Sequence, residues 1–374
     1  MRIGIFAPYD LARAGGVNTQ IRAQARALRA IGHEVHVYGP ASAPLANGEV
    51  AIGGITTVTF GGTESGLGLD PRSAWRVARI LKRESFDIVH VHEPLVPIVA
   101  WCAVACARAP VVGTFHVHRE DGHRFYPLAR PLLAPLARRL AYRIAVSDAA
   151  RRTVSRYFPG DYDIVSNGIE VDAFRVPRPR PACVDPDRQH VLFVGRLEPR
   201  KGVEYLIRAM AVVRRTIPRV RLLVVGDGPD RDRLAALAGS MHVDATFAGR
   251  VEDIELPAYF QWSDVISSPA LGGESFGIVL LEAMACEKPI VASRIDGYIG
   301  LAGDADCGPL VPPGDADALA VALTGLLARA DVRRVTGARG LAVARRYDWP
   351  ALALRLAAIY ERVHRGERAS SHVA

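Results

Sequence analysis

HVLFVGRLEPRKGVEYLIRAMAVVRRT, residues 190–216, contains in one stretch the unit from which this fold is built. The short Val- and Leu-rich run 190–194 predicts a buried β-strand, and the Gly- and Pro-containing residues 195–202 predict a loop. The apolar residues of 202–216 then recur with helical spacing. A strand that passes through a short loop into a helix is the repeating unit of parallel α/β proteins.

The same alternation extends in both directions along the 374 residues. Upstream we expect strands at 2–7, 34–38, 55–60, 88–92, 111–115, 143–146 and 163–165, with helices at 17–30, 72–84, 96–107 and 148–157 between them. Downstream we expect strands at 221–225, 245–247, 265–267 and 290–292, and helices at 230–238, 256–261, 277–285, 316–328 and 350–364. This order predicts an α/β protein with two parallel sheets, each covered by helices on both faces.

The pattern pauses at 174–188, where four prolines lie among several arginines. We expect this stretch to be a linker between two Rossmann-like domains. The first domain would comprise 1–173 together with the last helix at about 350–364, and the second would comprise 189–349. Residues 365–374 are expected to be a disordered tail.

The composition is that of a globular enzyme with a basic surface. Apolar residues make up 49% and charged residues 23%, and the net charge of +8 favours an anionic partner. The basic residues are spread over many elements, which argues against a nucleic-acid-binding protein. Five cysteines without metal-ligand spacing, and no signal-peptide pattern, predict a cytoplasmic protein. The longest apolar run, 95–107, is shorter than the roughly 20 residues that span a bilayer, so we expect any membrane contact to be peripheral.

Two loops of the second half carry the strongest functional signal. Residues 272–283, GGESFGIVLLEA, follow a predicted strand and open a helix, whose first N–H groups favour an anion. Glu274 lies before this helix and Glu282 lies within it, and carboxylates of this kind suit sugar hydroxyl groups. The loop after 190–194 adds two cations, Arg196 and Lys201, which can neutralise a diphosphate.

The first half contributes a glycine pair and a histidine at strand ends. Gly15 and Gly16 follow the first strand and open a helix, although the dinucleotide-binding glycine spacing is absent. His116 ends the strand 111–115, where a ring nitrogen can donate a hydrogen bond to a sugar or a leaving phosphate. His118 is a weaker candidate, and His90, His92 and Glu93 form a polar strand end that we interpret as structural.

A basic face is predicted on the helix 72–84. Arg72, Arg76, Arg79 and Arg83 fall within one narrow arc at about 100° per residue, and Trp75 lies at the border of that arc. Such a helix is typical of contact with anionic lipid, and equally of a solvated helix that packs its apolar side on its own sheet. Between 126 and 143, prolines 127, 131 and 135 predict a broken, movable segment and a second lipid-facing element.

These motifs resemble the retaining GT-B glycosyltransferases of family four. The resemblance covers nearly the whole chain and is nearest to bacterial phosphatidylinositol α-mannosyltransferases, notably over 272–284 and 1–17. It implies two facing Rossmann-like domains separated by a cleft, an acceptor side in the first half and a donor side in the second, and no metal or other cofactor. It also implies donor contacts by Val251 and by Phe276, Gly277 and Ile278, and catalytic roles for His116, Arg196, Lys201 and Glu274. The loop after His116 departs from the phosphatidylinositol enzymes, which bears on the acceptor.

The resulting hypothesis is transfer of a hexose, with mannose favoured, from a nucleotide-diphosphate sugar to a lipid acceptor such as phosphatidylinositol at the inner face of the cytoplasmic membrane. Closure of the two domains would bring Gly15, Gly16 and His116 to the donor. GDP-mannose is the expected donor and UDP-hexoses come next. Two alternatives remain open at this point: the same chemistry on a soluble sugar or polyol, and a sugar-nucleotide epimerase on the same fold. The sequence does not predict the oligomeric state.

Overall fold

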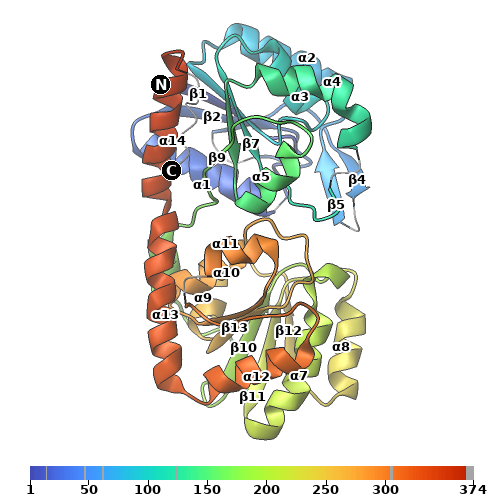
Figure 1. Ribbon diagram of the computed structural model, residues 1–374, viewed down its shortest axis with the longest axis vertical. Helices are drawn as coiled ribbons and strands as arrows, with labels where there is room; N and C mark the ends of the chain where they lie inside the picture. The colour runs from blue at the N-terminus through green and yellow to red at the C-terminus, as the bar shows by residue number, and fades with distance from the viewer. Residues whose placement is uncertain (14, 46–47, 61–62, 123–124, 304–305, 368–374) are drawn as a thin grey trace. The chain divides into compact units, whose positions relative to one another are not determined.

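The computed structural model describes residues 1–13, 15–45, 48–60, 63–122, 125–303 and 306–367. The chain divides into two compact units: unit 1 comprises Met1–Gly168 and Trp349–Ala374, and unit 2 comprises Ile169–Asp348. Each unit is a parallel sheet with helices on both faces, so the predicted α/β class is confirmed (Figure 1).

Unit 1 contains a seven-stranded parallel sheet in the order β3-β2-β1-β6-β7-β8-β9. Its strands are β1 (Arg2–Phe6), β2 (Glu34–Gly39), β3 (Glu49–Ala51), β6 (Ile88–His92), β7 (Val111–Phe115), β8 (Tyr142–Ala145) and β9 (Asp163–Ile164). Its helices are α1 (Gly16–Ala30), α2 (Pro71–Arg83), α3 (Val99–Cys106), α4 (Tyr126–Arg139), α5 (Asp148–Ser155) and α14 (Trp349–His364).

Successive strand residues of unit 1 enter different cores, as the pleat of a buried parallel strand requires. Ile88 packs with residues of α1 and α14 on one face, whereas Val89 packs with residues of α2, α3 and α4 on the other. The last helix, α14, therefore returns to unit 1, where Trp349 and Tyr360 are buried.

Unit 2 contains a six-stranded parallel sheet in the order β12-β11-β10-β13-β14-β15. Its strands are β10 (Gln189–Val194), β11 (Val220–Val225), β12 (Ala245–Gly249), β13 (Val265–Ser268), β14 (Ile290–Ser293) and β15 (Leu310–Val311). Its helices are α6 (Val171–Arg175), α7 (Val203–Thr216), α8 (Arg231–Ser240), α9 (Leu256–Gln261), α10 (Ile278–Ala285), α11 (Asp296–Ala302), α12 (Ala316–Leu327) and α13 (Ala330–Ala344), with short 3-10 turns at Pro199–Lys201 and Arg345–Tyr347.

The stretch expected to be a linker differs from the structure. The division between the units falls at Gly168 and Ile169, and residues 174–188 belong to unit 2. Val184 is buried in the core of unit 2, and the backbone of Arg178 bonds to the side chains of Gln261 and Trp262. The prolines interrupt regular structure there without detaching the chain from the domain. Most of the tail predicted to be disordered, 368–374, lies outside the described residues.

Two other local predictions were wrong. The strand expected at 55–60 belongs to an antiparallel hairpin, β4 (Thr56–Phe60) with β5 (Thr63–Leu67), and not to the parallel sheet. The segment expected to be broken by prolines is the continuous helix α4. Pro127 occupies its first turn, and the backbone carbonyls that Pro131 and Pro135 leave unbonded lie on its exposed face, where water can satisfy them.

Candidate functional site

The strand order of unit 2 reverses beside β10, whose neighbours are β11 on one side and β13 on the other. In open parallel sheets this is the position at which ligands bind, beyond the carboxyl ends of the strands. The loop after β10 carries Arg196 and Lys201, and the loop after β13 carries Glu274. The two predicted loops therefore lie at the switch point of one sheet.

Backbone contacts hold these two loops together. The amide of Leu271 donates to the carbonyl of Arg200 at 2.8 Å. Gly202 has φ 67°, and a Cβ at this position would lie 2.0 Å from the carbonyl oxygen of Pro269. Only glycine fits both that conformation and that approach. The close passage of the loops follows from this glycine.

Glu274 accepts from two cations across the loops. Lys201 Nζ lies 2.7 Å and Arg200 Nη1 2.5 Å from Glu274 Oε1. Burial raises the pKa of Glu274, but Lys201 and Arg200 together outweigh that effect and hold the pKa below its usual value. Glu274 is therefore ionised at neutral pH.

A second carboxylate, Glu198, shares Arg200 with Glu274 and also lies near Arg196. Glu198 is buried, and its carboxylate lies 2.6 Å from Arg200 Nε and 3.6 Å from Arg196 Nε. The cluster thus contains three cations, Arg196, Arg200 and Lys201, against two carboxylates, and its excess positive charge suits an anionic ligand.

The helix after this cluster begins as the sequence predicts. Gly277 precedes α10 with φ 92°, and a Cβ there would lie 2.8 Å from the ring of Tyr298. The first N–H groups of an α-helix have no acceptor within the helix. Phe276 is buried and packs edge-on against Tyr347 at 5.5 Å, while Ile278 and Val251 are half-buried against the same core.

Glu282 lies in α10 and forms no ion pair with another described residue. Burial, reinforced by the negative charge of Asp253, raises its pKa to about 8. The free protein therefore holds this carboxyl largely protonated at neutral pH. Two hydroxyl groups donating to it would favour the ionised form instead.

Unit 1 places its predicted residues at the carboxyl edge of its own sheet. Gly15 caps α1 through its carbonyl, which accepts from the Thr19 amide at 3.0 Å. A Cβ on Gly15 would meet no atom of the described residues within 4 Å. Packing does not explain this glycine, so close approach by a ligand remains a prediction for Gly15 and for Gly16, the first residue of α1.

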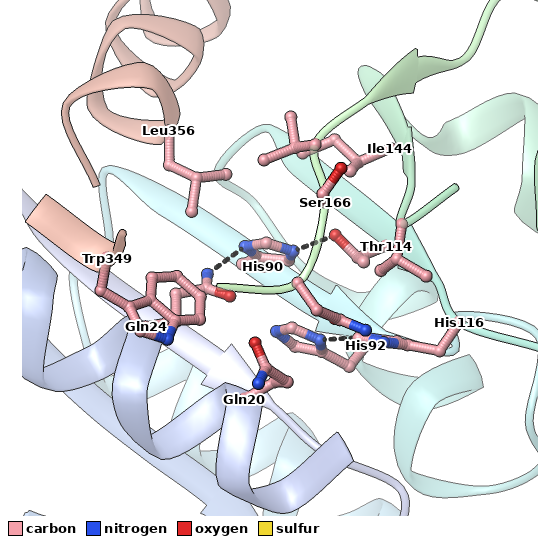
Figure 2. Close-up of a pocket in the computed structure, with 13 residues that line it drawn as sticks. Gln20, Gln24, His90, His92, Thr114, His116, Ile144, Ser166, Trp349 and Leu356 are labelled. Atoms are coloured by element: carbon pink, nitrogen blue, oxygen red, sulfur yellow. Dashed lines mark hydrogen bonds between the residues drawn. The ribbon is translucent and has the colours of Figure 1, made fainter. Parts of the chain in front are cut away.

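His116 is fixed through both its backbone and its ring. Glu93 Oε1 accepts from the amides of His116 at 2.5 Å and Val117 at 2.9 Å. The ring nitrogen Nε2 lies 2.8 Å from Nδ1 of His92 (Figure 2). Burial lowers the pKa of His116 to about 4, so its imidazole is neutral at physiological pH.

The residues behind His116 form a buried polar network. His90 Nδ1 lies 2.5 Å from the Tyr360 hydroxyl and 3.0 Å from Gln24 Nε2, and His90 Nε2 lies 2.7 Å from Thr114 Oγ1. The His90 ring stacks on that of His92 with centroids 4.6 Å apart. A small cavity of about 20 Å³ lies among these side chains and Trp349 (Figure 2).

The predicted basic face of α2 is present on unit 1. Arg72, Trp75, Arg76, Arg79 and Arg83 are all exposed, whereas Val77 and Leu81 are buried. The Arg79 guanidinium lies over the Trp75 ring at 5.3 Å. Helix α4 adds exposed apolar side chains, since Leu128 and Leu132 are 87% and 60% exposed.

The described residues contain neither a cluster of metal-ligand side chains nor a helix that could cross a membrane. Within 1–367, apart from its undescribed gaps, no three His, Cys, Asp or Glu side chains are grouped as metal ligands would be. Over the same residues, no helix combines the length and apolar character needed to cross a bilayer.

Four residues of these clusters were not predicted to take part in a site: Glu198, Arg200, His92 and Glu93. Arg200 and Glu198 lie in the loop that supplied Arg196 and Lys201, and the alternation of charges in RLEPRK was the available signal. His92 and Glu93 were interpreted as structural. Their contacts with His116 depend on the pairing of β6 with β7, which the sequence does not reveal.

The chain is similar to known glycosyltransferases along both of its halves. The family description "Glycosyl transferases group 1" matches residues 181–342, and "Glycosyltransferase Family 4" matches residues 14–173. The chain is 37% identical to the phosphatidyl-myo-inositol mannosyltransferase of Mycobacterium leprae, over 97% of each chain. It is 31% identical to the D-inositol 3-phosphate glycosyltransferase of Mycolicibacterium paratuberculosis, over 94% of this chain and 86% of that protein.

Solved structures share the fold at lower identity. The sucrose-phosphate synthase of Thermosynechococcus elongatus has a TM-score of 0.78 at 23% identity, and covers 98% of this chain and 100% of its own. Anabaena HepE, solved with UDP and glucose, has a TM-score of 0.76 at 21% identity, over 96% and 99%. With near-full-length sequence relatives and two Rossmann-like units, the chain belongs to the family-four glycosyltransferases of the GT-B fold.

Proposed function

We propose that this glycosyltransferase moves a mannose from GDP-mannose to an inositol phospholipid at an anionic membrane surface, with retention of anomeric configuration and without a metal. The observation that carries the donor half of this proposal is the Lys201–Glu274 ion pair at the switch point of unit 2. The acceptor half rests on the phosphatidyl-myo-inositol mannosyltransferases, to which the chain is 36–37% identical over almost its full length.

Arg196, Arg200 and Lys201 bind the diphosphate in this proposal. They outnumber the carboxylates of the cluster, and Lys201 remains 15% exposed. As the bond to the sugar breaks, negative charge grows on the departing diphosphate, and each well-placed cation contributes a few kcal/mol of stabilisation. Cationic side chains thereby take the role that a metal ion has in other transferases.

Glu274 and Glu282 bind hydroxyl groups. Glu274 is fixed by Lys201 and Arg200 beside the diphosphate position, so it orients the sugar together with the backbone at Phe276, Gly277 and Ile278. Glu282 accepts from the ribose diol, and Val251 lies next to the base. Because the cations hold Glu274 in ion pairs, we assign it binding and not nucleophilic attack, which is compatible with front-face transfer and retention.

In this proposal, the surface of the protein that contacts the membrane is formed by α2 and α4. The four arginines of α2 are exposed, and so are Leu128 and Leu132 of α4 and Phe125 directly before it. Both helices pack on the same core cluster of unit 1. Cations that attract anionic headgroups, combined with apolar side chains that insert among the acyl chains, are typical of peripheral membrane proteins. The inner face of the cytoplasmic membrane, rich in anionic lipid, is the expected location.

A soluble acceptor is the second candidate. The relatives named D-inositol 3-phosphate glycosyltransferase, 31% identical to this chain, favour a phosphorylated polyol in place of a lipid. The loop after His116 is where the two acceptors would be distinguished. An epimerase on the same fold stays a lesser alternative.

The test is transfer from radiolabelled GDP-mannose, or from UDP-glucose, to phosphatidylinositol in vesicles, to inositol phosphate in solution, and to water. We expect labelled lipid with GDP-mannose in excess EDTA, and an α-linkage in the product. Labelled inositol phosphate alone would establish the soluble alternative. A new sugar nucleotide formed from donor alone would indicate an epimerase, and activity abolished by EDTA would contradict metal independence.

A further inference from the structure

The buried rings of His92 and His116 indicate how His116 acts on the substrates, an inference that rests on the proposed function. His116 is buried, and one of its two ring nitrogens is already engaged by a second buried histidine. We infer that His92 is a positioning residue that holds His116 in the tautomer with its proton on Nδ1. His116 then presents an N–H donor, and not a base, to an oxygen of the substrates.

Both rings are neutral. Burial lowers the pKa of His116, and the pKa of His92 is lowered by burial and further by His90 and His116. A bond between two neutral imidazoles at 2.8 Å requires that one nitrogen donates and the other accepts. Only two arrangements satisfy this condition, and they differ in which histidine donates.

The surroundings of His92 distinguish the two arrangements. If His92 accepted at Nδ1, its proton would sit on Nε2, which is buried and has no hydrogen-bond partner among the described residues. A buried N–H without an acceptor is rare and costs about 1–3 kcal/mol. With the proton on Nδ1, His92 donates to His116 Nε2 and leaves only a lone pair unpaired. The second arrangement is therefore favoured.

The small cavity beside His92 also favours the arrangement in which His92 carries its proton on Nδ1. Trp349 also lines it, and the indole Nε1, which can only donate, is buried without a partner among the described residues. A lone pair on His92 Nε2 complements that donor, whereas a second N–H would add another unsatisfied donor to the same space (Figure 2).

The ring of His92 is itself held in place. His90 stacks on it with an interplanar angle of 11°, and His90 is fixed at both nitrogens by Tyr360, Gln24 and Thr114. His116 is fixed independently by the bond that its backbone amide donates to Glu93. With Nε2 of His116 engaged, Nδ1 is the ring nitrogen left for a ligand, and no described residue bonds to it.

The first experiment reads the tautomer directly, in the full-length protein without substrate. Long-range ¹H–¹⁵N correlation of ¹⁵N-histidine-labelled protein distinguishes protonated from unprotonated ring nitrogens, and loss of a signal in His116→Asn assigns it. We expect His116 to be protonated on Nδ1. A spectrum with the proton on Nε2 would overturn the inference whether or not the enzyme transfers mannose.

The second experiment uses two substitutions that separate the hydrogen bond from the packing. His92→Phe keeps a flat ring between His90 and His116 but removes the donor, and His92→Asn restores an N–H near the position of Nδ1. We expect kcat to fall about tenfold in H92F, with KM for GDP-mannose unchanged, because Nε2 of His116 loses the donor that fixes the Nδ1 tautomer. H92N should recover most of kcat and the Nδ1 tautomer.

His36→Phe, the same substitution on strand β2 of the same sheet, should leave kcat unchanged. A wild-type kcat in folded H92F, or an equal loss in H92F and H92N, would contradict the positioning role. If no donor and acceptor support transfer by the wild-type protein, the proposed function fails, while the tautomer of His116 remains decided by the spectrum.

Discussion

Lys201 Nζ lies 2.7 Å from Oε1 of Glu274, although the two residues follow different strands of the unit 2 sheet. Glu274 also binds Arg200, which in turn binds the buried Glu198. The cations are thus oriented before any donor arrives, so little side-chain entropy remains to be lost when a diphosphate binds. Preorganised charge of this kind stabilises a transition state more than flexible surface charge does.

Removal of either partner should reduce transfer strongly. We expect Lys201→Ala and Glu274→Gln each to lower kcat about 10²- to 10³-fold, because the first removes a cation from the departing diphosphate and the second removes an acceptor from the sugar. Steady-state kinetics with GDP-mannose provides the measurement. Lys201→Ala should also weaken GDP binding, because the ground state already carries the diphosphate charge.

The matched control is Arg208→Ala. Arg208 pairs with Glu204 at 2.9 Å on the exposed surface of α7, so its loss removes an ion pair of the same kind outside the site. Its kcat should equal that of the wild type. Equal losses in Arg208→Ala and Lys201→Ala would mean that the effect is one of general stability.

Glu282 should release a proton when the donor binds. Its pKa in the free protein is raised to about 8 by burial and by Asp253, so the protonated form predominates at pH 7. Ribose hydroxyl groups that donate to it favour the carboxylate, so binding releases a proton at pH 7. The affinity for GDP-mannose should rise with pH up to about 8 and level off above it.

Calorimetry in buffers of different ionisation enthalpy measures this proton release. Glu282→Gln should abolish the release and weaken binding about tenfold, whereas Glu204→Gln on the surface of α7 should change neither. Uptake of a proton by the wild-type protein, or an affinity independent of pH between 6.5 and 8, would remove Glu282 from the ribose site.

The contacts among the candidate residues could be expected from the sequence more readily in unit 2 than in unit 1, for a physical reason. Lys201 and Glu274 follow strands that are next to each other in the sheet, and the carboxyl ends of parallel strands share one edge, so their meeting could be expected. The part played by Arg200 and Glu198 depends on the turn Pro199–Lys201, whose side-chain directions no spacing rule gives. The bond between His92 and His116 depends on strand register, which is fixed only by the folded core.

Helices and strands with a clear apolar period could be predicted from the sequence. Two helices with unusual residues could not: α4, which contains prolines, and α13, which contains glycines. Helix α4 continues through two internal prolines because Tyr126, Leu133 and Ala137 anchor its other face in the core. Helix α13 was not predicted, since its glycines and arginines hide any apolar period. Those glycines are explained by close packing on neighbouring elements, which is a tertiary property.

Gly337 in α13 provides a test of that packing. A Cβ there would lie 1.9 Å from the carbonyl oxygen of Glu287, so we expect Gly337→Ala to lower the free energy of unfolding by about 1–3 kcal/mol. Gly325→Ala in α12 is the control, because its Cβ would meet nothing within 4 Å, and alanine in a helix should stabilise by about 0.5–1 kcal/mol. Urea unfolding would measure both, and opposite signs are required.

The basic face of α2 should supply the salt-dependent part of membrane binding. Replacing all four arginines, Arg72, Arg76, Arg79 and Arg83, with glutamine should weaken binding to phosphatidylinositol-containing vesicles by about 4 kcal/mol at low salt, since each surface cation contributes about 1 kcal/mol. Four exposed arginines of unit 2 form the control with the same change in net charge: Arg214, Arg215, Arg231 and Arg233. Equal weakening by both sets in vesicle sedimentation would show that net charge alone attracts the protein.

Helix α4 should supply the salt-independent part. Leu128 and Leu132 are 87% and 60% exposed, an arrangement that gains free energy only when another apolar phase covers them. The double substitution Leu128→Ser and Leu132→Ser should weaken vesicle binding about tenfold or more at high salt, where the contribution of α2 is screened. Val321→Ser and Leu354→Ser, at similarly exposed apolar positions on α12 and α14, should have no effect.

The double variant of Leu128 and Leu132 should keep its rate on a short-chain, water-soluble phosphatidylinositol, because only docking to the bilayer is lost. A loss of rate on that soluble acceptor would place the two leucines at the acceptor site and not at the membrane.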